Sequence, residues 1–293
     1  MRYGAIDTGS NAVRLLIADI IENDGSVTFK KNTLIRVPLR LGDDAFLNQH
    51  ISDKKGDDMV KTMQAFKNLM DVYKVTDYMA CATSAMREAD NGQEIVARIK
   101  KEANLDLEII HGEREASIIY ASHVGIELDE DKNYLYIDVG GGSTELSIFS
   151  EGELVASQSF NIGTIRILDN QDKDETWKEM NEFVRKHTKS FKTLYGVGTG
   201  GNINKLFKMS EEKNGEPLSY NKLKSLYNYL GSYSLKDRIN VLKLNQDRAD
   251  VIIPACEIYT TVMKWANIKQ IYVPSVGMVD GIIQTLIEKN LLK

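Results

Sequence analysis

Two carboxylates flank a run of glycines near the middle of the chain, in the segment YLYIDVGGGSTELSIFS at residues 134–150. Asp138 precedes the run and Glu145 follows it. Glycine takes the positive φ that a tight turn requires and lets backbone N–H groups approach an anion closely. Carboxylates beside such a loop suit a divalent cation held between them and a phosphate, whereas a flexible hairpin is the alternative. The predicted phosphate-binding residues are Gly140, Gly141, Gly142 and Ser143.

A second copy of this pattern opens the chain, in the segment YGAIDTGSNAVRLLIAD at residues 3–19. Aligning Asp7 with Asp138 gives an offset of 131 residues, which is close to half of the 293-residue chain. A matched pair at this spacing indicates a duplicated domain core. Two such units facing one another would form a cleft with a phosphate-binding loop on each wall. An Asx-type turn is the alternative for Asp7, and the predicted phosphate-binding residues of this copy are Asp7, Gly9, Ser10 and Asn11.

Two arginines stand close to these loops in the predicted sheets. Arg87 follows the end of a predicted strand, and its guanidinium suits bidentate binding of phosphate. A surface salt bridge with Glu88 or Asp90 is the alternative interpretation. Arg14 lies inside a strand, so it needs a partner, and we expect either an anion or Glu145.

Hydrolysis also requires a base, and none of the four histidines lies in a recognisable motif. Glu113 and Glu115 occupy the first turn of a predicted helix, where the helix dipole would stabilise either carboxylate without any catalytic role. The functional alternative is that one of them polarises the attacking water. Phosphate loops and carboxylates together indicate phosphoryl transfer or hydrolysis assisted by Mg²⁺, with Asp138 and Glu145 as metal ligands.

Alternating strands and helices must position these residues. We expect strands at residues 2–7, 14–20, 27–38, 77–82, 107–111, 134–139, 144–149, 154–161, 194–197 and 270–273. We expect helices at residues 52–73, 91–102, 113–124, 174–191, 220–230, 235–242, 247–266 and 277–288, and one that ends at residue 208. This order suits mixed sheets flanked by helices. A boundary near residues 125–132 separates an N-terminal domain (1–125) from a C-terminal domain (126–293) with extra helices, whose last helix could pack back on the first domain.

Composition limits the class of protein. A hydrophobic content of 42% with 27% charged residues is typical of a soluble globular protein. A net charge of −5 argues against a nucleic-acid-coating protein, and no apolar run approaches membrane-spanning length. We expect the chain to begin directly with a strand, without a signal peptide, and we expect Cys81 and Cys256 to be reduced core thiols. We therefore expect a cytoplasmic protein with neither nucleic acid nor membrane as a partner.

Five motifs follow one another along the chain: DTGSN at residues 7–11, ATSAMREA at 82–89, GEREA at 112–116, DVGGGSTE at 138–145 and GTIR at 163–166. Together they resemble the exopolyphosphatase and guanosine pentaphosphate phosphatase (Ppx/GppA) family. The resemblance implies an α/β fold of two ribonuclease-H-like domains of the actin and sugar-kinase superfold, with an inter-domain cleft. It also implies dependence on Mg²⁺, with Mn²⁺ as the alternative metal, and a homodimer as the usual assembly.

Residue roles carry over motif by motif from this resemblance. The departures are Arg114, where the family usually has an acidic residue, and Asn202, where it commonly has threonine. We also expect a short-form member, without the C-terminal His-Asp region of longer members. The implied roles are the catalytic glutamate on Glu115, the metal-site and phosphate-site acids on Asp138 and Glu145, the first-loop aspartate on Asp7, the phosphate-site serine on Ser143 and the arginine on Arg87.

Three functions stay open at this point. The first is an exopolyphosphatase that releases orthophosphate from the end of inorganic polyphosphate. The second is a 5′-phosphohydrolase of guanosine pentaphosphate, with residues 198–201 as its guanosine pocket and a role in the stringent response. The third is a non-catalytic sensor of phosphate or nucleotide, which the intact Glu115, Asp138 and Glu145 argue against.

Overall fold

A computed structural model describes residues 1–23, 26–121, 131–274 and 276–291 of the chain. The chain divides into two compact units, Met1–Val124 with Gly277–Lys293, and Gly125–Val276. Each unit contains one mixed sheet, so the predicted α/β class is confirmed. The predicted boundary at residues 125–132 lies largely outside the described residues.

The first unit has a sheet with the strand order β3-β2-β1-β4-β5, in which β1 is antiparallel to β2 and parallel to β4. Its elements are β1 (Arg2–Thr8), β2 (Val13–Asn23), β3 (Ser26–Val37), α1 (Leu41–Asn48), α2 (Asp53–Val72), β4 (Asp77–Ala82), α3 (Ser84–Glu88), α4 (Gly92–Ala103), β5 (Glu108–Ile109), α5 (Gly112–Ala121) and α13 (Met278–Leu291).

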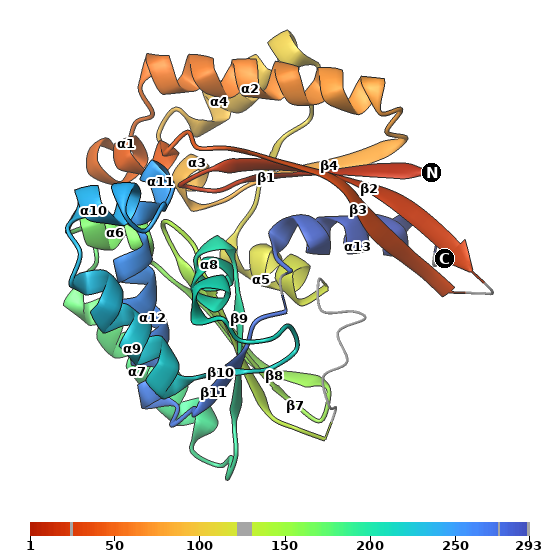
Figure 1. Ribbon diagram of the computed structural model, residues 1–293. Helices are drawn as coiled ribbons and strands as arrows, with labels where there is room; N and C mark the ends of the chain where they lie inside the picture. The colour runs from red at the N-terminus through yellow and green to blue at the C-terminus, as the bar shows by residue number, and fades with distance from the viewer. Residues whose placement is uncertain (24–25, 122–130, 275, 292–293) are drawn as a thin grey trace. The chain divides into compact units, whose positions relative to one another are not determined.

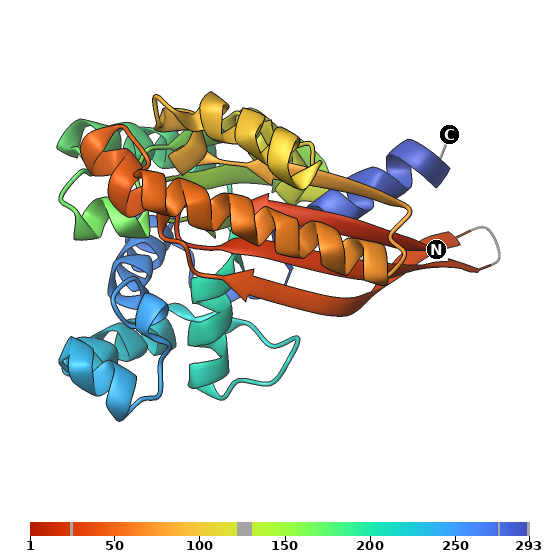
Figure 2. The ribbon, with the colours of Figure 1, turned by 90° about the horizontal axis from the view of Figure 1, so that it is seen from above.

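Helices cover both faces of this sheet (Figure 1). Side chains alternate along β1, so Tyr3 and Ala5 pack into a core with residues of α5 and α13. Gly4 faces the other way, where a Cβ would lie 2.8 Å from the sulfur of Met70 in α2. Figure 2 shows α2 lying over the strands of this sheet.

Helix α13 lies directly against α5. A Cβ at Gly281 would come within 1.8 Å of the carbonyl oxygen of Ile118, so only glycine permits this approach of two backbones. The neighbouring residue, Asp280, is buried, and its Oδ1 forms an ion pair with Lys31 Nζ of β3 at 2.6 Å. The C-terminal helix therefore determines where α5 lies in the first unit.

The second unit has the strand order β10-β11-β9-β6-β7-β8, with its main core between this sheet and helices such as α7 and α12. Its elements are β6 (Tyr134–Val139), β7 (Thr144–Ser150), β8 (Glu153–Phe160), α6 (Thr164–Leu168), α7 (Asp174–Thr188), β9 (Tyr195–Thr199), α8 (Gly201–Ser210), β10 (Leu218–Ser219), α9 (Tyr220–Gly231), α10 (Leu235–Asn240), α11 (Gln246–Ala249), α12 (Ile252–Trp265) and β11 (Gln270–Tyr272).

The two sheets repeat one topology. The order β3-β2-β1-β4 of the first unit corresponds to β8-β7-β6-β9 of the second, with the same antiparallel and parallel pairings. The loops correspond as well, because Gly9 N donates to Ala12 O at 3.2 Å and Gly140 N donates to Ser143 O at 2.9 Å. These four residues keep the offset of 131 that the sequence showed, in agreement with a duplicated core.

Several predicted elements differ from the structure. The sequence patterns did not indicate the short helices α1 and α6, which are too short for a clear 3.6-residue repeat. The single helix predicted at residues 247–266 is two helices, because Pro254 suits only the first turn of α12. The predicted helix at 113–124 is α5, and its last three predicted residues lie outside the described part of the chain.

Both cysteines are free thiols and buried, as predicted. Burial raises the pKa of Cys81 and of Cys256 to about 12 each, and the carboxylates of Glu108 and Asp7 add to the shift at Cys81. In the described part of the chain, helices of the length and apolarity that a membrane crossing requires are absent.

Candidate active site

Asp138 and Glu145 are directly opposite one another in the β6–β7 pair, so their side chains leave the same face of the second sheet. Glu145 is 4% exposed, and Ser159 donates a hydrogen bond to its Oε1 at 2.7 Å. Two carboxylates on one face fit Mg²⁺, which proteins bind through one or two carboxylates plus phosphate and water oxygens. Clusters of three or more His, Cys, Asp or Glu side chains that could hold a metal ion are absent from the described residues.

The glycine loop between these strands presents backbone donors. Its carbonyl groups are bound by α6: Thr164 N donates to Gly140 O at 3.1 Å, Ile165 N to Gly141 O at 2.8 Å, and Arg166 Nε to Gly142 O at 2.6 Å. A trans peptide directs its N–H opposite to its C=O.

The N–H groups of Gly141, Gly142 and Ser143 therefore point away from α6, and they donate to no acceptor among the described residues. Three neighbouring donors of this kind form an anion-binding nest. Gly140, Gly141 and Gly142 all have negative or extended φ values, whereas Gly200, in the neighbouring turn, has a φ of +95°. Close packing needs glycine instead at Gly163, where a Cβ would lie 2.4 Å from Gly141 O.

Arg166 and Ser159 contact the candidate site, and neither was among the site residues predicted from the sequence. Arg166 is 6% exposed, and its hydrogen bond to Gly142 O fixes the orientation of the peptide whose N–H belongs to Ser143 of the nest. The GTIR motif was a signal for it, whereas nothing in the sequence around Ser159 indicated the bond to Glu145.

The end of β9 borders Asp138. Thr199 is its neighbour in the parallel β6–β9 pair, and a Cβ at Gly200 would lie 2.9 Å from Asp138 Oδ1. Tyr259 donates to Thr199 O at 2.6 Å. Burial, together with the charge of Asp138, raises the pKa of Tyr259 well above its ordinary value, so its hydroxyl stays protonated.

The guanosine pocket predicted at residues 198–201 does not form as a four-residue loop. Gly198 lies inside β9, where a Cβ would meet the side chains of Ile203 and Ile271 at 2.9 Å. Gly200 alone lies between β9 and α8, because Thr199 ends the strand and Gly201 begins the helix.

In the first unit, Asp7 and Arg14 are opposite one another in the β1–β2 pair and form an ion pair at 2.5 Å. Asp7 is 4% exposed. Within the first unit, Arg14 is therefore the partner of the first-loop aspartate, which the sequence did not predict. The predicted partners of Arg14, an anion or Glu145, stay predictions.

The first loop is held in the same way as the glycine loop. Gly42 N donates to Ser10 O at 2.9 Å and Arg40 N donates to Asn11 O at 3.0 Å, at the start of α1. Ser10 Oγ and Ser84 Oγ, both 2% exposed, share a hydrogen bond of 2.9 Å. Ser84 was not among the predicted site residues, although it lies in the ATSAMREA motif, and it joins the first loop to α3.

Arg87 and Glu115 come together in the first unit. Arg87, on α3, donates from Nη1 to Ile110 O at 2.8 Å, and the same nitrogen lies 3.9 Å from Glu115 Oε2. Glu115 is 9% exposed, whereas Glu113 on the same helical turn is exposed. Only one of the two candidate bases is thus enclosed beside a guanidinium.

The predicted site residues form two groups. The first unit contributes Asp7, Gly9, Ser10, Asn11, Arg87 and Glu115, and the second contributes Asp138, Glu145 and the nest. Within the first unit a carboxylate lies beside a guanidinium, and within the second unit two carboxylates share one face of the sheet and the loop between their strands forms the nest. Each of these groups is suited to binding phosphate or a divalent cation.

Comparison with known proteins gives relatives that match either about half of this chain or nearly all of it. A protein named "Exopolyphosphatase 1" from Mycobacterium bovis is 29% identical over 167 residues, which cover 57% of this chain and 48% of that protein. A protein named "Putative exopolyphosphatase" from Haemophilus influenzae is 24% identical over 301 residues, which cover 98% of this chain and 91% of that protein. The chain spans half the length or less of several curated relatives that it matches.

Among solved structures, an exopolyphosphatase from Cytophaga hutchinsonii superposes with a TM-score of 0.84 at 26% identity, covering 99% of this chain and 98% of that one. The predicted two-domain actin-like fold is thereby confirmed. The Ppx/GppA phosphatase family matches residues 21–290. This chain is a member of the Ppx/GppA phosphatase family.

Proposed function

We propose that this protein is an exopolyphosphatase, which hydrolyses the terminal phosphoanhydride bond of inorganic polyphosphate and releases orthophosphate. The observation that carries the proposal is the enclosed carboxylate of Glu115, 3.9 Å from the guanidinium of Arg87. A carboxylate beside a phosphate-binding cation lies close to the bound phosphate, where it can accept a proton from the attacking water.

In the proposed reaction, Glu115 accepts a proton from a water molecule whose oxygen attacks the terminal phosphorus. The bond between that phosphorus and the bridging oxygen breaks, and the shortened chain leaves with the bridging oxygen. Arg87 and the N–H groups of Gly141, Gly142 and Ser143 bind the non-bridging oxygens, where negative charge is spread in the transition state. Ser10, held by Ser84, would bind a further phosphate oxygen.

Asp138 and Glu145 would hold the Mg²⁺ that the family resemblance implies, with Mn²⁺ as the alternative. Its chemistry when bound is to neutralise phosphate charge and polarise the phosphoryl oxygens. Ser159 orients Glu145 for this role through its 2.7 Å hydrogen bond. Asp7 is paired with Arg14, so we place it as a positioning residue of the first loop and not as a metal ligand.

Polyphosphate is the substrate we favour over guanosine pentaphosphate. The Haemophilus relative and the Cytophaga structure, both named for exopolyphosphatase activity, correspond to this chain over nearly their full lengths. The predicted guanosine pocket is reduced to Gly200 and Gly201, because Gly198 is packed in the core. With both thiols reduced and buried, we also propose that the protein works in the cytoplasm.

The test is phosphate release by the purified chain with Mg²⁺ on long-chain polyphosphate, tripolyphosphate and guanosine pentaphosphate. Glu115→Gln is compared with Glu113→Gln, which makes the same chemical change on an exposed side chain of the same helix. We expect release from polyphosphate that falls at least a hundredfold in Glu115→Gln and stays near wild type in Glu113→Gln.

Other outcomes would contradict parts of the proposal. Equal activity of the two variants would exclude Glu115 as the base. Release from guanosine pentaphosphate alone would replace the substrate. Binding of all three compounds without any release would make a phosphate sensor the better description.

A further inference from the structure

The second unit carries a groove that the proposed reaction does not use. It has a volume of about 1360 Å³ and is formed where α7 and α12 end and where β9, α9 and β11 begin. Five of its lining residues are basic and none is acidic: Arg185, Lys189, Lys192, Lys264 and Lys269. A wholly basic groove is unexpected on a chain with a net charge of −5.

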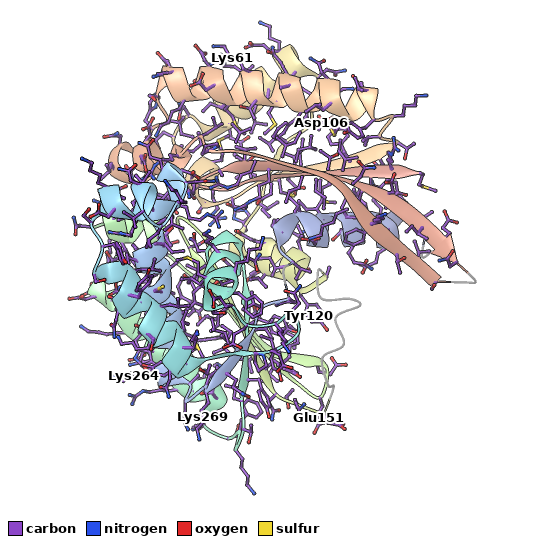
Figure 3. The ribbon with its side chains drawn as sticks, viewed as in Figure 1. Lys61, Asp106, Tyr120, Glu151, Lys264 and Lys269 are labelled. Carbon is purple, nitrogen blue, oxygen red and sulfur yellow. The ribbon has the colours of Figure 1, made fainter. Side chains whose placement is uncertain are left out.

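These five side chains are exposed, and in the described part of the chain none of them forms an ion pair with a carboxylate. Figure 3 shows Lys264 and Lys269 at the same end of the second unit. Uncompensated cations in a concave surface concentrate the positive potential, which attracts anions.

Helix ends explain only part of this charge. Cations stabilise a helix C-terminus, which accounts for Arg185 and Lys189 at the end of α7 and for Lys264 in the last turn of α12. Lys192 and Lys269 lie outside any helix. The two helix C-termini and the α9 N-terminus together contribute a partial charge of about −0.5, far less than five cations supply.

The groove and the nest lie at opposite ends of the strands of the second sheet. It includes Tyr195, where β9 begins, whereas Thr199, at the end of β9, borders Asp138. Four residue steps along a strand span about 13 Å. The groove is therefore separate from the phosphate-binding residues of the second unit.

We propose that this basic groove binds a second segment of a long polyphosphate chain, away from the phosphate that is hydrolysed. This inference rests on the proposed function for its ligand. A second contact on the same polymer raises the effective concentration of its ends, so it lowers the KM for long chains and leaves kcat unchanged. Tripolyphosphate is too short to occupy both places and gains nothing.

The test uses the full chain with Glu115→Gln, so that binding is measured without turnover. A groove variant, K189Q/K192Q/K269Q, is compared with a control variant, K54Q/K101Q/K236Q, which removes three exposed lysines outside the groove and changes the net charge equally. Thermal unfolding of both variants checks that folding is retained.

We expect the groove variant to bind long-chain polyphosphate about tenfold more weakly than the control variant, with a smaller dependence on salt. Tripolyphosphate should bind both variants equally. In the active protein, the groove variant should raise the KM for the long chain alone. These results would hold for binding even if no phosphate were released, so a failure of the proposed function is distinguished from a failure of this inference.

Equal affinity of the groove and control variants for the long chain would overturn the inference. A single-stranded oligonucleotide with the same number of phosphates serves as a competing ligand, since Tyr220 and Trp265 also line the groove. Tighter, groove-dependent binding of the oligonucleotide than of polyphosphate would overturn the assignment to an inorganic chain.

Discussion

The contact between α13 and α5 predicts that one added methyl group will displace α5, the helix that carries the proposed base Glu115. In Gly281→Ala the new Cβ would lie 1.8 Å from Ile118 O, whereas ordinary van der Waals contact begins at 3.4 Å. The two backbones would have to separate by about 1.6 Å, because a carbonyl group of a helix cannot rotate aside.

The size of the effect follows from this separation. Overpacking of a close contact costs about 1–3 kcal/mol of unfolding free energy. Ile118 is three residues from Glu115, so a shift of α5 also moves the carboxylate away from Arg87, from which it is 3.9 Å distant. A displacement of about 1 Å in a catalytic group can reduce the rate about a hundredfold.

The assay compares Gly281→Ala with Gly277→Ala, because a Cβ at Gly277 would meet no atom within 4 Å. Denaturant unfolding and phosphate release from polyphosphate are measured for both variants. We expect Gly281→Ala to lose both stability and kcat, and Gly277→Ala to keep both. A Gly281→Ala variant with wild-type stability would refute the packing argument. Lost stability with wild-type kcat would refute the link from α13 to Glu115.

Three further predictions follow from single residues. Ser159→Ala removes the hydrogen bond that orients Glu145, so the Mg²⁺ concentration for half-maximal activity should rise about tenfold, and an unchanged Mg²⁺ titration would contradict this. Burial raises the pKa of Asp280 above its ordinary value of 3.8. The protonated side chain therefore adds to the free energy of unfolding below pH 3.8, and this contribution is lost as the pH rises through the raised pKa. Asp280→Asn stays neutral, so its unfolding free energy in urea should rise relative to that of the wild type as the pH increases from 4 to 8. A relative fall over this range would contradict the argument. With pKa values of about 12, Cys81 and Cys256 are thiolates in about one molecule in ten thousand at pH 8, so a thiol reagent should label them only after denaturation.

Local patterns in the sequence were sufficient to predict the two loops and most of the helices and strands. Side-chain alternation and glycine runs are properties of neighbouring residues, so the two loops and their carboxylates could be read directly from residues 3–19 and 134–150. The offset of 131 residues between Asp7 and Asp138 predicted the repeated topology that the sheets show. Short helices such as α6 gave no such pattern and were missed.

By itself, the sequence determined which residue types stand at the strand ends, and hence the proposal of a phosphate-binding site with carboxylates. The tertiary structure decided what those residues contact. Arg14 is bonded to Asp7, and the N–H groups of the nest are directed by the bonds that Thr164 and Arg166 make to the preceding carbonyls. The burial of Glu115 also depends on packing of elements far apart in the chain. Such contacts join residues across different strands and helices, so no spacing along the chain encodes them, and only the folded arrangement distinguishes Glu115 from Glu113.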